Sequence, residues 1–377
     1  MGRVSFATHC LLRALFREHV GYMILIAFLI IPLTRSLFMF LSGYTLIDVL
    51  ERVHEWILHF VLFCLFILAW GFYSYSPKAH IPIVISSNGH DFEKLKNAMK
   101  KAGYKPWNIG EMRKVLGSVS FDEEKFSTIV IDRGRIRDND ELRERVQEVK
   151  RKVLFIAKEI AGHSLVGSKF HVFFMTDVPV SLSFITGRIF GNEHIPFSIY
   201  AEEIKKRGDI EHLRQVISIE DLNSTPEPCE FLLRCNGSEL KTQLVEGEIE
   251  EIAKNIRSEK VLIFINFTPT VEDRDALSSF SRKYGHEIVE IELPEKEYIP
   301  IEKMRKISIH TKNITRFIGH LISRGVDITL ALKIPHPISF SLGYNLRYQN
   351  LKITHYHRDF ESGERYFEPV SLHELLK

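Results

Sequence analysis

The chain has 377 residues, of which 45% are hydrophobic and 26% are charged, and its formal net charge is +2. This near-neutral balance argues against a basic surface of the kind that binds a DNA or RNA polymer. The sequence contains four cysteines, which are too scattered for a disulfide framework and lack the spacing of a metal site: Cys10, Cys64, Cys229 and Cys235.

Two long apolar runs lie near the N-terminus, at residues 20–41 and 56–75. Each run has the roughly 20 residues that a helix needs to cross a bilayer core. The second run contains no Asp, Glu, Lys or Arg. A secretory signal peptide is the alternative for the first run, but the run is too long and no clear cleavage site follows it. We therefore expect residues 1–76 to form a module of two transmembrane helices.

The charges that flank these runs predict their orientation. Basic residues stand before the first run and after the second, at Arg3, Arg13, Arg17 and Lys78. The intervening loop is mainly acidic, with Asp48, Glu51, Arg52 and Glu55. The positive-inside rule then predicts a multi-pass protein of the inner membrane, with the N-terminus and the soluble domain in the cytoplasm.

Beyond residue 77 strands alternate with helices, which is typical of an α/β domain with a largely parallel sheet. In residues 77–222 we predict strands at 81–85, 126–131, 170–175 and 196–200, and helices at 91–102, 140–160 and 180–190. In residues 223–377 we predict strands at 229–234, 261–265, 287–291, 328–332 and 352–356, and helices at 246–256, 271–284, 302–323 and 338–348.

These two parts share the pattern P-x4-F-x2-G-x12-Y. It occurs at Pro179, Phe184, Gly187 and Tyr200, and again at Pro335, Phe340, Gly343 and Tyr356. An Asn-Gly pair also follows the first predicted strand of each part, at 88–89 and 236–237. Repetition on this scale predicts two similar subdomains, 77–222 and 223–377, related by a pseudo-two-fold axis. We expect the two phenylalanines in the core, and the two glycines to let their helix approach the sheet.

Open parallel sheets bind ligands beyond the carboxyl ends of their strands, where the start of the next helix favours anions. The candidate ligand residues at such ends are Ser86, Asn88, Thr176, Asp177, Asn236, Lys333 and His336. Lys333 offers a cation to a phosphate, and His336 can stack or donate a hydrogen bond. Arg188 and Arg347 lie farther along the two repeated helices, where each can reach a phosphate or be solvated.

No motif in the sequence requires a catalytic explanation. There is no Walker A motif, no G-x-G-x-x-G after a strand and no G-x-S-x-G. His355 and His357 alternate along a predicted strand, and we expect them to face solvent rather than bind a metal. Asp273 and Asp275 are similar to the acidic triplet of some glycosyltransferases, but they stand in a charged helical stretch. We expect no enzymatic activity, no metal and no resident cofactor.

The C-terminal part contains ITLALKIP, PISFSLGYNL, KITHY and RYFEPVSL within residues 327–372, and the first part carries the related FFMTDVPVSLSFITGRIF. With the two N-terminal apolar runs, this resembles the membrane-anchored SAVED-domain effectors of CBASS antiphage systems. A SAVED domain is a fusion of two CARF-like (Rossmann-like) subdomains. The resemblance covers residues 80–377 by architecture and residues 327–372 by motif.

The resemblance implies a receptor for a cyclic di-, tri- or tetranucleotide made by a partner nucleotidyltransferase. In this sequence Thr176, Asp177, Lys333 and His336 match the family's ligand positions, although an aspartate departs from what a phosphate site prefers. Ligand binding would drive assembly of a homo-oligomer, whose transmembrane helices disrupt the bilayer and kill the infected cell. Two alternatives remain: a membrane-anchored nucleotide-sugar enzyme that uses Asp273 and Asp275, and a CARF-type sensor of cyclic oligoadenylate made by a CRISPR complex.

Overall fold

The computed structural model describes a large part of the region beyond residue 78. The described residues are 42, 79–86, 91–106, 128–130, 136, 138–157, 168–175, 178–204, 210–224, 229–235, 238–242, 244, 246–268, 274–295, 298–355 and 366–377. The two predicted membrane spans, residues 20–41 and 56–75, lie outside them. Within the described ranges, no helix combines the length and apolar character needed to cross a bilayer. Residues 80–107, 122–160 and 168–377 form one compact unit, which contains both sheets described below.

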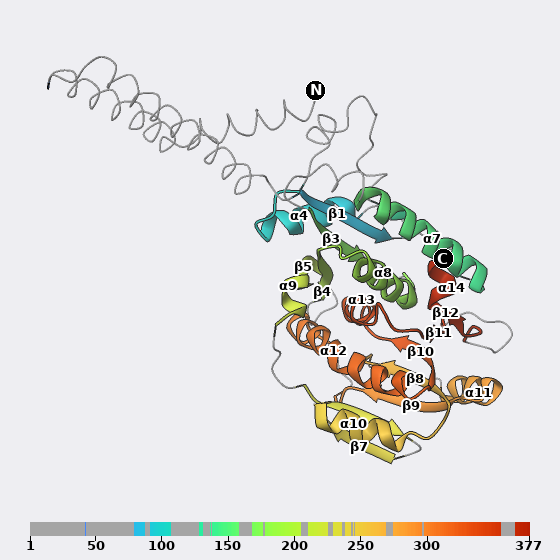
Figure 1. The fold of residues 1–377 in the computed structure, drawn as a ribbon. Coiled ribbons are helices and arrows are strands. Elements are labelled where there is room, and N and C mark those ends of the chain that lie inside the picture. Colours follow the sequence, from blue (N-terminus) through green and yellow to red (C-terminus); the bar gives the residue numbers. More distant parts are fainter. Residues whose placement is uncertain are drawn as a thin grey trace. The chain divides into compact units, whose positions relative to one another are not determined.

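The first sheet has the strand order β2-β1-β3-β4-β5 among the described residues (Figure 1). Its strands are β1 (Ala79–Ser86), β2 (Thr128–Val130), β3 (Ser168–Phe174), β4 (Phe197–Ile204) and β5 (Ile210–Ser218). The pairs β1·β2 and β3·β4 are parallel, whereas β5 runs antiparallel to β4. All seven residues of β3 are buried, including Lys169 and His171, as expected of a strand in the middle of a sheet that is covered on both faces.

The second sheet has the order β12-β11-β10-β8-β9-β6-β7 in the described part. Its strands are β6 (Phe231–Cys235), β7 (Ser238–Thr242), β8 (Lys260–Asn266), β9 (Glu287–Glu292), β10 (Asp327–Lys333), β11 (Lys352–Ile353) and β12 (Val370–Ser371). The four strands β9, β8, β10 and β11 are parallel. At the edges, β12 is antiparallel to β11, β6 is antiparallel to β9, and β7 is antiparallel to β6. The prediction of largely parallel sheets is therefore correct for their centres and wrong for their edges.

The two sheets share one order of strands over five positions. The order β2-β1-β3-β4-β5 of the first sheet corresponds to β9-β8-β10-β11-β12 of the second, and β5 and β12 are the antiparallel edges. The strands β6 and β7 are an antiparallel addition beyond β9. The partner of β1 in the repeat is therefore β8, and the predicted equivalence between β1 and the strand before Asn236 is wrong.

The helices lie between these strands in both halves. They are α4 (Phe92–Lys101), α7 (Asn139–Phe155), α8 (Val180–Asn192), α9 (Ile219–Leu222), α10 (Glu246–Asn255), α11 (Arg274–Tyr284), α12 (Ile301–Ser323), α13 (His336–Asn345) and α14 (Leu372–Leu376). Asp138 caps α7 by accepting hydrogen bonds from the amides of Asp140 and Glu141 at 2.9 and 2.8 Å. Gly325, with φ of +83°, follows the last turn of α12, where a left-handed residue ends a helix without strain.

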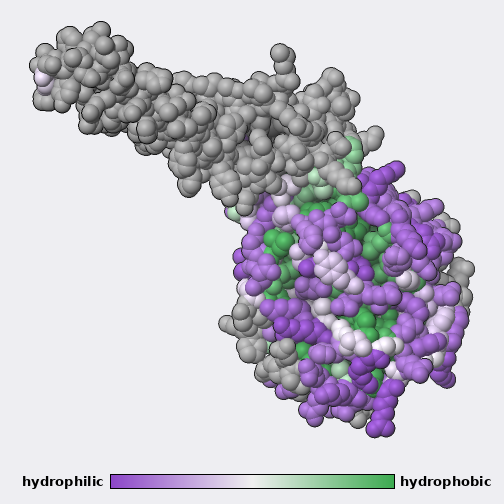
Figure 2. Space-filling view, in the orientation of Figure 1, coloured by the Kyte–Doolittle hydropathy of each residue, from purple (hydrophilic) through white to green (hydrophobic). Residues whose placement is uncertain are grey.

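Burial differs sharply between the helices. One face of α7 is buried through Leu142, Val146, Val149 and Val153. By contrast, α8 is buried from Ser181 to Gly191, and α13 from Pro337 to Gly343. Figure 1 shows these two helices side by side at the centre of the compact unit, and they pack directly on each other. On the face drawn in Figure 2, hydrophilic residues cover most of the described surface, with smaller hydrophobic areas between them.

Candidate functional site

The contact between α8 and α13 is reciprocal. A Cβ atom at Gly187 would lie 2.0 Å from the carbonyl oxygen of Phe340, and a Cβ atom at Gly343 would lie 1.9 Å from the carbonyl oxygen of Phe184. The glycine of each repeat therefore accommodates the backbone at the phenylalanine of the other repeat. We expected these glycines to bring a helix onto its sheet, and that expectation is wrong because they bring the two helices together. Both phenylalanines are fully buried, as predicted.

The N-termini of the two helices meet at the same end of this contact. The Ser339 hydroxyl donates to the Val180 carbonyl at 3.0 Å, and the Ser183 hydroxyl donates to the same oxygen at 2.8 Å. Nδ1 of His336 lies 3.2 Å from Oγ of Ser183, and the imidazole stacks on Phe174 at the end of β3, with ring centroids 5.6 Å apart. Both N-termini thus lie where β3 and β10 end.

A second serine–histidine pair joins the halves nearby. Oγ of Ser181 lies 2.9 Å from Nδ1 of His355, and both side chains are buried. The backbone carbonyl of His355 accepts a hydrogen bond from the amide of Phe367 at 3.0 Å. The expectation that His355 faces solvent is wrong, because the strand ends at Ile353 and the chain then turns this ring towards α8. His357 lies outside the described residues.

The end of β8 adds polar groups that sequence reasoning missed. Asn266 pairs with Lys333 in the register of β8 and β10, and the amide of Phe267 donates to the Lys333 carbonyl at 3.0 Å. The fully buried Asn266 accepts hydrogen bonds from the amide and hydroxyl of Thr268, at 3.2 and 3.1 Å. The sequence offers one indication of Asn266, which is the single polar residue at the end of the apolar run VLIFIN.

The electrostatics at this end favour an anion. Each helix N-terminus carries about half a positive charge from its unpaired amides. Pro179 and Pro335 occupy the N-cap positions, and a proline side chain cannot accept a hydrogen bond from those amides. Neither α8 nor α13 has an acidic residue in its first turn, and Lys333 adds a full positive charge. The N-termini of α8 and α13 converge, and Lys333 lies between β10 and α13. This arrangement is suited to bind phosphate.

The structure places the predicted site residues as follows. Ser86 is fully buried at the end of β1, where its hydroxyl donates to Sδ of Met175 at 2.9 Å. Lys333 and His336 stand at the end of β10 and the start of α13. Arg347 lies beyond the other end of α13, so about 15 Å of helix separates it from His336. The remaining predicted residues, Asn88, Thr176, Asp177 and Asn236, lie outside the described part of the chain.

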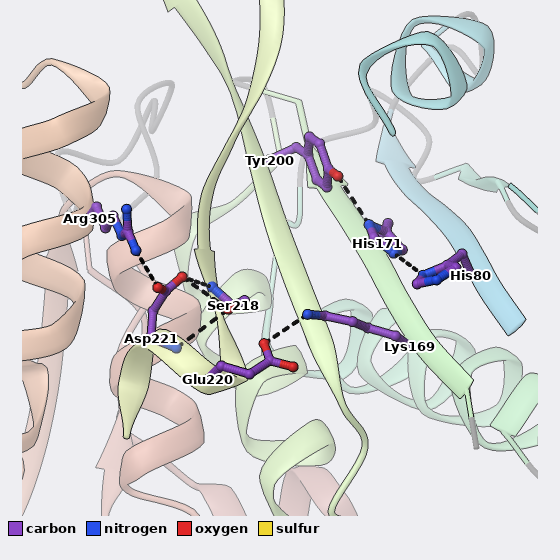
Figure 3. Close-up of polar contacts among 8 residues, drawn as sticks. All are labelled: His80, Lys169, His171, Tyr200, Ser218, Glu220, Asp221 and Arg305. Carbon is purple, nitrogen blue, oxygen red and sulfur yellow. Dashed lines mark hydrogen bonds and ion pairs between the residues drawn. The ribbon is translucent and has the colours of Figure 1, made fainter. Parts of the chain in front are cut away.

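A separate polar chain crosses the first sheet (Figure 3). Nδ1 of His80 lies 3.0 Å from Nε2 of His171, whose Nδ1 lies 3.1 Å from the Tyr200 hydroxyl. Burial, assisted by His80 and Lys169, lowers the pKa of His171 to about 3, and burial raises the pKa of Tyr200. These contacts join His80 on β1, His171 on β3 and Tyr200 on β4. His171 and Tyr200 are therefore neutral at physiological pH, and the network links neighbouring strands of the sheet.

The linker between the halves is held by ion pairs, also drawn in Figure 3. Glu220 accepts from Lys169 on β3 at 2.8 Å, and its neighbour Asp221 binds Arg305 on α12. Ser218 and Asp221 form a capping box at the start of α9. Adjacent acidic residues therefore fasten α9 to both halves, which the sequence patterns did not predict.

The alternative enzyme would use Asp273 and Asp275. Asp275 is exposed near the start of α11, and Asp273 lies outside the described ranges. Among the side chains that the structure places, no group of three His, Cys, Asp or Glu converges as metal ligands. Burial raises the pKa of Cys235 to about 12, which keeps this thiol protonated.

The fold and the site together define an α/β protein with two similar halves and one shared polar centre. No family model matches the sequence, and no curated protein matches it. Solved structures of an Acinetobacter baumannii receptor, the Cap4 SAVED/CARF-domain protein, are similar at 12% identity. The structure with the cyclic trinucleotide 3'3'3'-cAAA gives a TM-score of 0.44 over 81% of this chain and 53% of that chain.

The same receptor with 2'3'3'-cAAA gives a TM-score of 0.44 over 85% of this chain and 55% of that chain. A further structure of the receptor gives 0.39 over 74% and 54%. The present chain therefore spans about half the length of these receptors. Similarity of this size assigns neither a family nor a ligand, so the function must be argued from the site.

Proposed function

We propose that the chain is a receptor for a cyclic oligonucleotide, bound at the end of the α8–α13 pair where both helices begin. The observation that carries this proposal is the reciprocal contact of Gly187 with Phe340 and Gly343 with Phe184. It brings equivalent helix N-termini from two halves to one place. A ligand with repeated phosphates and bases suits a site that is itself built from a repeat.

The described groups have the chemistry that such a ligand needs. The amides at the start of α8 and α13, together with Lys333, favour phosphates. His336 is held in one orientation by Ser183 and by the ring of Phe174, so it can stack on a base without first losing rotational freedom. The motifs in residues 327–372 that resemble a SAVED domain contribute this lysine, this histidine and α13 itself.

The receptor is proposed to act as a membrane effector of antiphage defence. Residues 20–41 and 56–75 would cross the inner membrane as two helices, with the soluble domain in the cytoplasm. A partner nucleotidyltransferase would supply the ligand. Binding would shift the chain towards an oligomer only if the ligand prefers the assembled state. The clustered hairpins would then disrupt the bilayer, a function that needs no catalysis by this chain.

The test is binding of the full-length chain, purified in detergent, to a panel of cyclic di-, tri- and tetranucleotides that includes both cyclic triadenylates named above. We expect at least one ligand to bind, and light scattering to show a larger particle when it does. Lys333→Met should weaken binding at least tenfold, whereas Lys303→Met, on the exposed face of α12, should leave it unchanged. Absence of binding across the panel would contradict the receptor proposal, and binding without a size change would contradict assembly.

A further inference from the structure

Two arginines lie at the opposite end of the α8–α13 pair. Arg188 lies near the end of α8, and its Nη1 donates to the Leu346 carbonyl at 3.0 Å. Arg347 follows α13, and its Nη1 donates to the Tyr344 carbonyl at 3.2 Å. A Cβ atom at Gly191 would lie 2.8 Å from Cδ of Arg347, so the Arg347 side chain crosses α8 one turn from Arg188. The absence of a side chain at Gly191 is what allows this approach.

Within the described part of the chain, no carboxylate opposes the buried charge of Arg188. Arg188 is only 7% exposed, and burial alone, with no opposing carboxylate, lowers its pKa to about 10. Nε of Arg188 and Nε of Arg347 are buried and have no hydrogen-bond partner among the described residues. The two converging helix C-termini supply about half a negative charge each, so roughly one positive charge remains.

An uncompensated buried guanidinium destabilises a fold, because desolvation of the charge is not offset by an ion pair. We therefore expect a protein to retain an uncompensated buried guanidinium where that group binds a ligand. The surroundings are also ordered for binding: the Arg347 guanidinium lies 5.1 Å from the ring centroid of Tyr344 and 4.8 Å from that of Tyr348. Tyr348 is 69% exposed, so this arginine is held at the surface between aromatic rings.

We propose that Arg188 and Arg347 form a binding site for an oxyanion, a phosphate or a carboxylate, distinct from the nucleotide site at the other end of the helices. The planar guanidinium groups, each with N–H donors left over, match the two oxygens of either anion. His194, whose Nε2 lies 3.5 Å from the Tyr348 hydroxyl, stands beside it. This inference is independent of the nucleotide that the chain binds.

The experiment compares the Tm of the full-length chain in sodium phosphate, sodium acetate and sodium chloride at equal ionic strength. We expect phosphate or acetate to raise the Tm by about 2 °C over chloride, as a ligand at several times its Kd does for a protein of this size. A rise of the Tm in phosphate alone identifies a phosphate site, and a rise in acetate alone identifies a carboxylate site. Arg347→Met should remove the rise, and Arg282→Met, an exposed arginine on α11, should retain it.

Arg188→Met gives a second readout. Removing the buried charge should raise the Tm in chloride while abolishing the response to the anion, a combination that a purely structural arginine would not show. If Arg188→Met fails to fold, Arg347→Met still decides the question because Arg347 is half-buried. Equal Tm values in the three salts for the unmodified chain, or an undiminished rise in Arg347→Met, would overturn the proposal.

Discussion

At the scale of single residues, two glycines determine how closely the halves approach. Gly187 and Gly343 each face a backbone carbonyl at a distance that no β-carbon tolerates. Backbone cannot move aside as the end of a flexible side chain can, so the space at these positions is fixed by the fold.

We predict that Gly343→Ala lowers the free energy of unfolding by about 3 kcal/mol, the upper part of the range for overpacked cores. Gly187→Ala should do the same because the contact is reciprocal. Chemical denaturation measures both. The matched control is Gly319→Ala in α12, where a Cβ atom would lie 3.7 Å from Gln349. This change should stabilise the chain by up to about 1 kcal/mol, through the higher helix propensity of alanine. Equal stability of all three variants would contradict the helix contact described here.

Another residue with a measurable signature is His171. Its pKa is lowered to about 3 in the folded chain, chiefly by burial, whereas an unfolded chain takes up this proton near pH 6.5. The unfolded state therefore binds more protons below pH 6.5, so stability falls as the pH decreases from 6.5 towards 3.

We predict that the unfolding equilibrium constant rises by up to tenfold per pH unit between pH 6 and pH 5 because of His171. Denaturation at a series of pH values measures this slope. His171→Gln, which retains hydrogen-bonding groups, should flatten the slope even if it lowers the overall stability. His373→Gln, an exposed histidine on α14, should leave the slope as it is. An unchanged slope in His171→Gln would show that the ring is not buried as described.

At the scale of elements, the first turn of α8 joins the second half through two histidines. Ser181 contacts His355 and Ser183 contacts His336. A serine–histidine hydrogen bond in a buried place contributes about 1 kcal/mol, and a partner left alone costs more. The start of α8 is therefore fixed to β10, α13 and the segment after β11 together.

A double-mutant cycle tests this junction. Ser181→Ala and His355→Phe should each destabilise the chain, and their effects should fall short of additivity by about 1 kcal/mol. Ser323→Ala combined with His355→Phe provides the control, because Ser323 is exposed at the end of α12 and donates to a carbonyl in its own helix. Additive effects of Ser181→Ala and His355→Phe would mean that the two side chains do not interact in solution.

At the scale of the whole molecule, the described elements of the two halves contact each other in several places. The helices α8 and α13 pack face to face, α9 is tied to α12 through Asp221 and Arg305, and α14 packs on α7. In the last contact, Gln147 donates to the Leu375 carbonyl at 2.9 Å. Helix α14 of the second half thus packs on α7 of the first half. Contacts of this kind hold the two halves together, as a ligand site shared between them requires.

Much of this architecture could be predicted from the sequence, because long amphipathic helices and apolar strands have distinct periods. The helices that became α8 and α12 were placed within one or two residues. The edge strands β5, β7 and β12 were missed because their sequences, such as SELKT in β7, lack a continuous apolar run. We predicted that β6 is the repeat of β1, but β6 is an antiparallel strand. The apolar pattern of a strand does not encode its direction, so the sequence did not reveal this difference.

The site was predictable only in part. Lys333 and His336 followed from the rule that ligands bind at the carboxyl ends of parallel strands. Contacts between halves that are far apart in the sequence place Ser181, Ser183 and His355, and local patterns carry no record of such contacts. Asn266 is placed by the pairing of β8 with β10 within the second half. Arg188 was expected at a phosphate or in solvent, and its burial follows from the same packing of α8 on α13.

The most direct test of a shared site is hydrogen–deuterium exchange of the full-length chain with and without the cyclic nucleotide that binds most tightly in the panel. We expect the amides in the first turns of α8 and α13 to become protected together, because one ligand contacts both. The C-terminal turns of these helices should change little. Protection of only one of the two N-termini, or protection confined to another part of the chain, would contradict the claim.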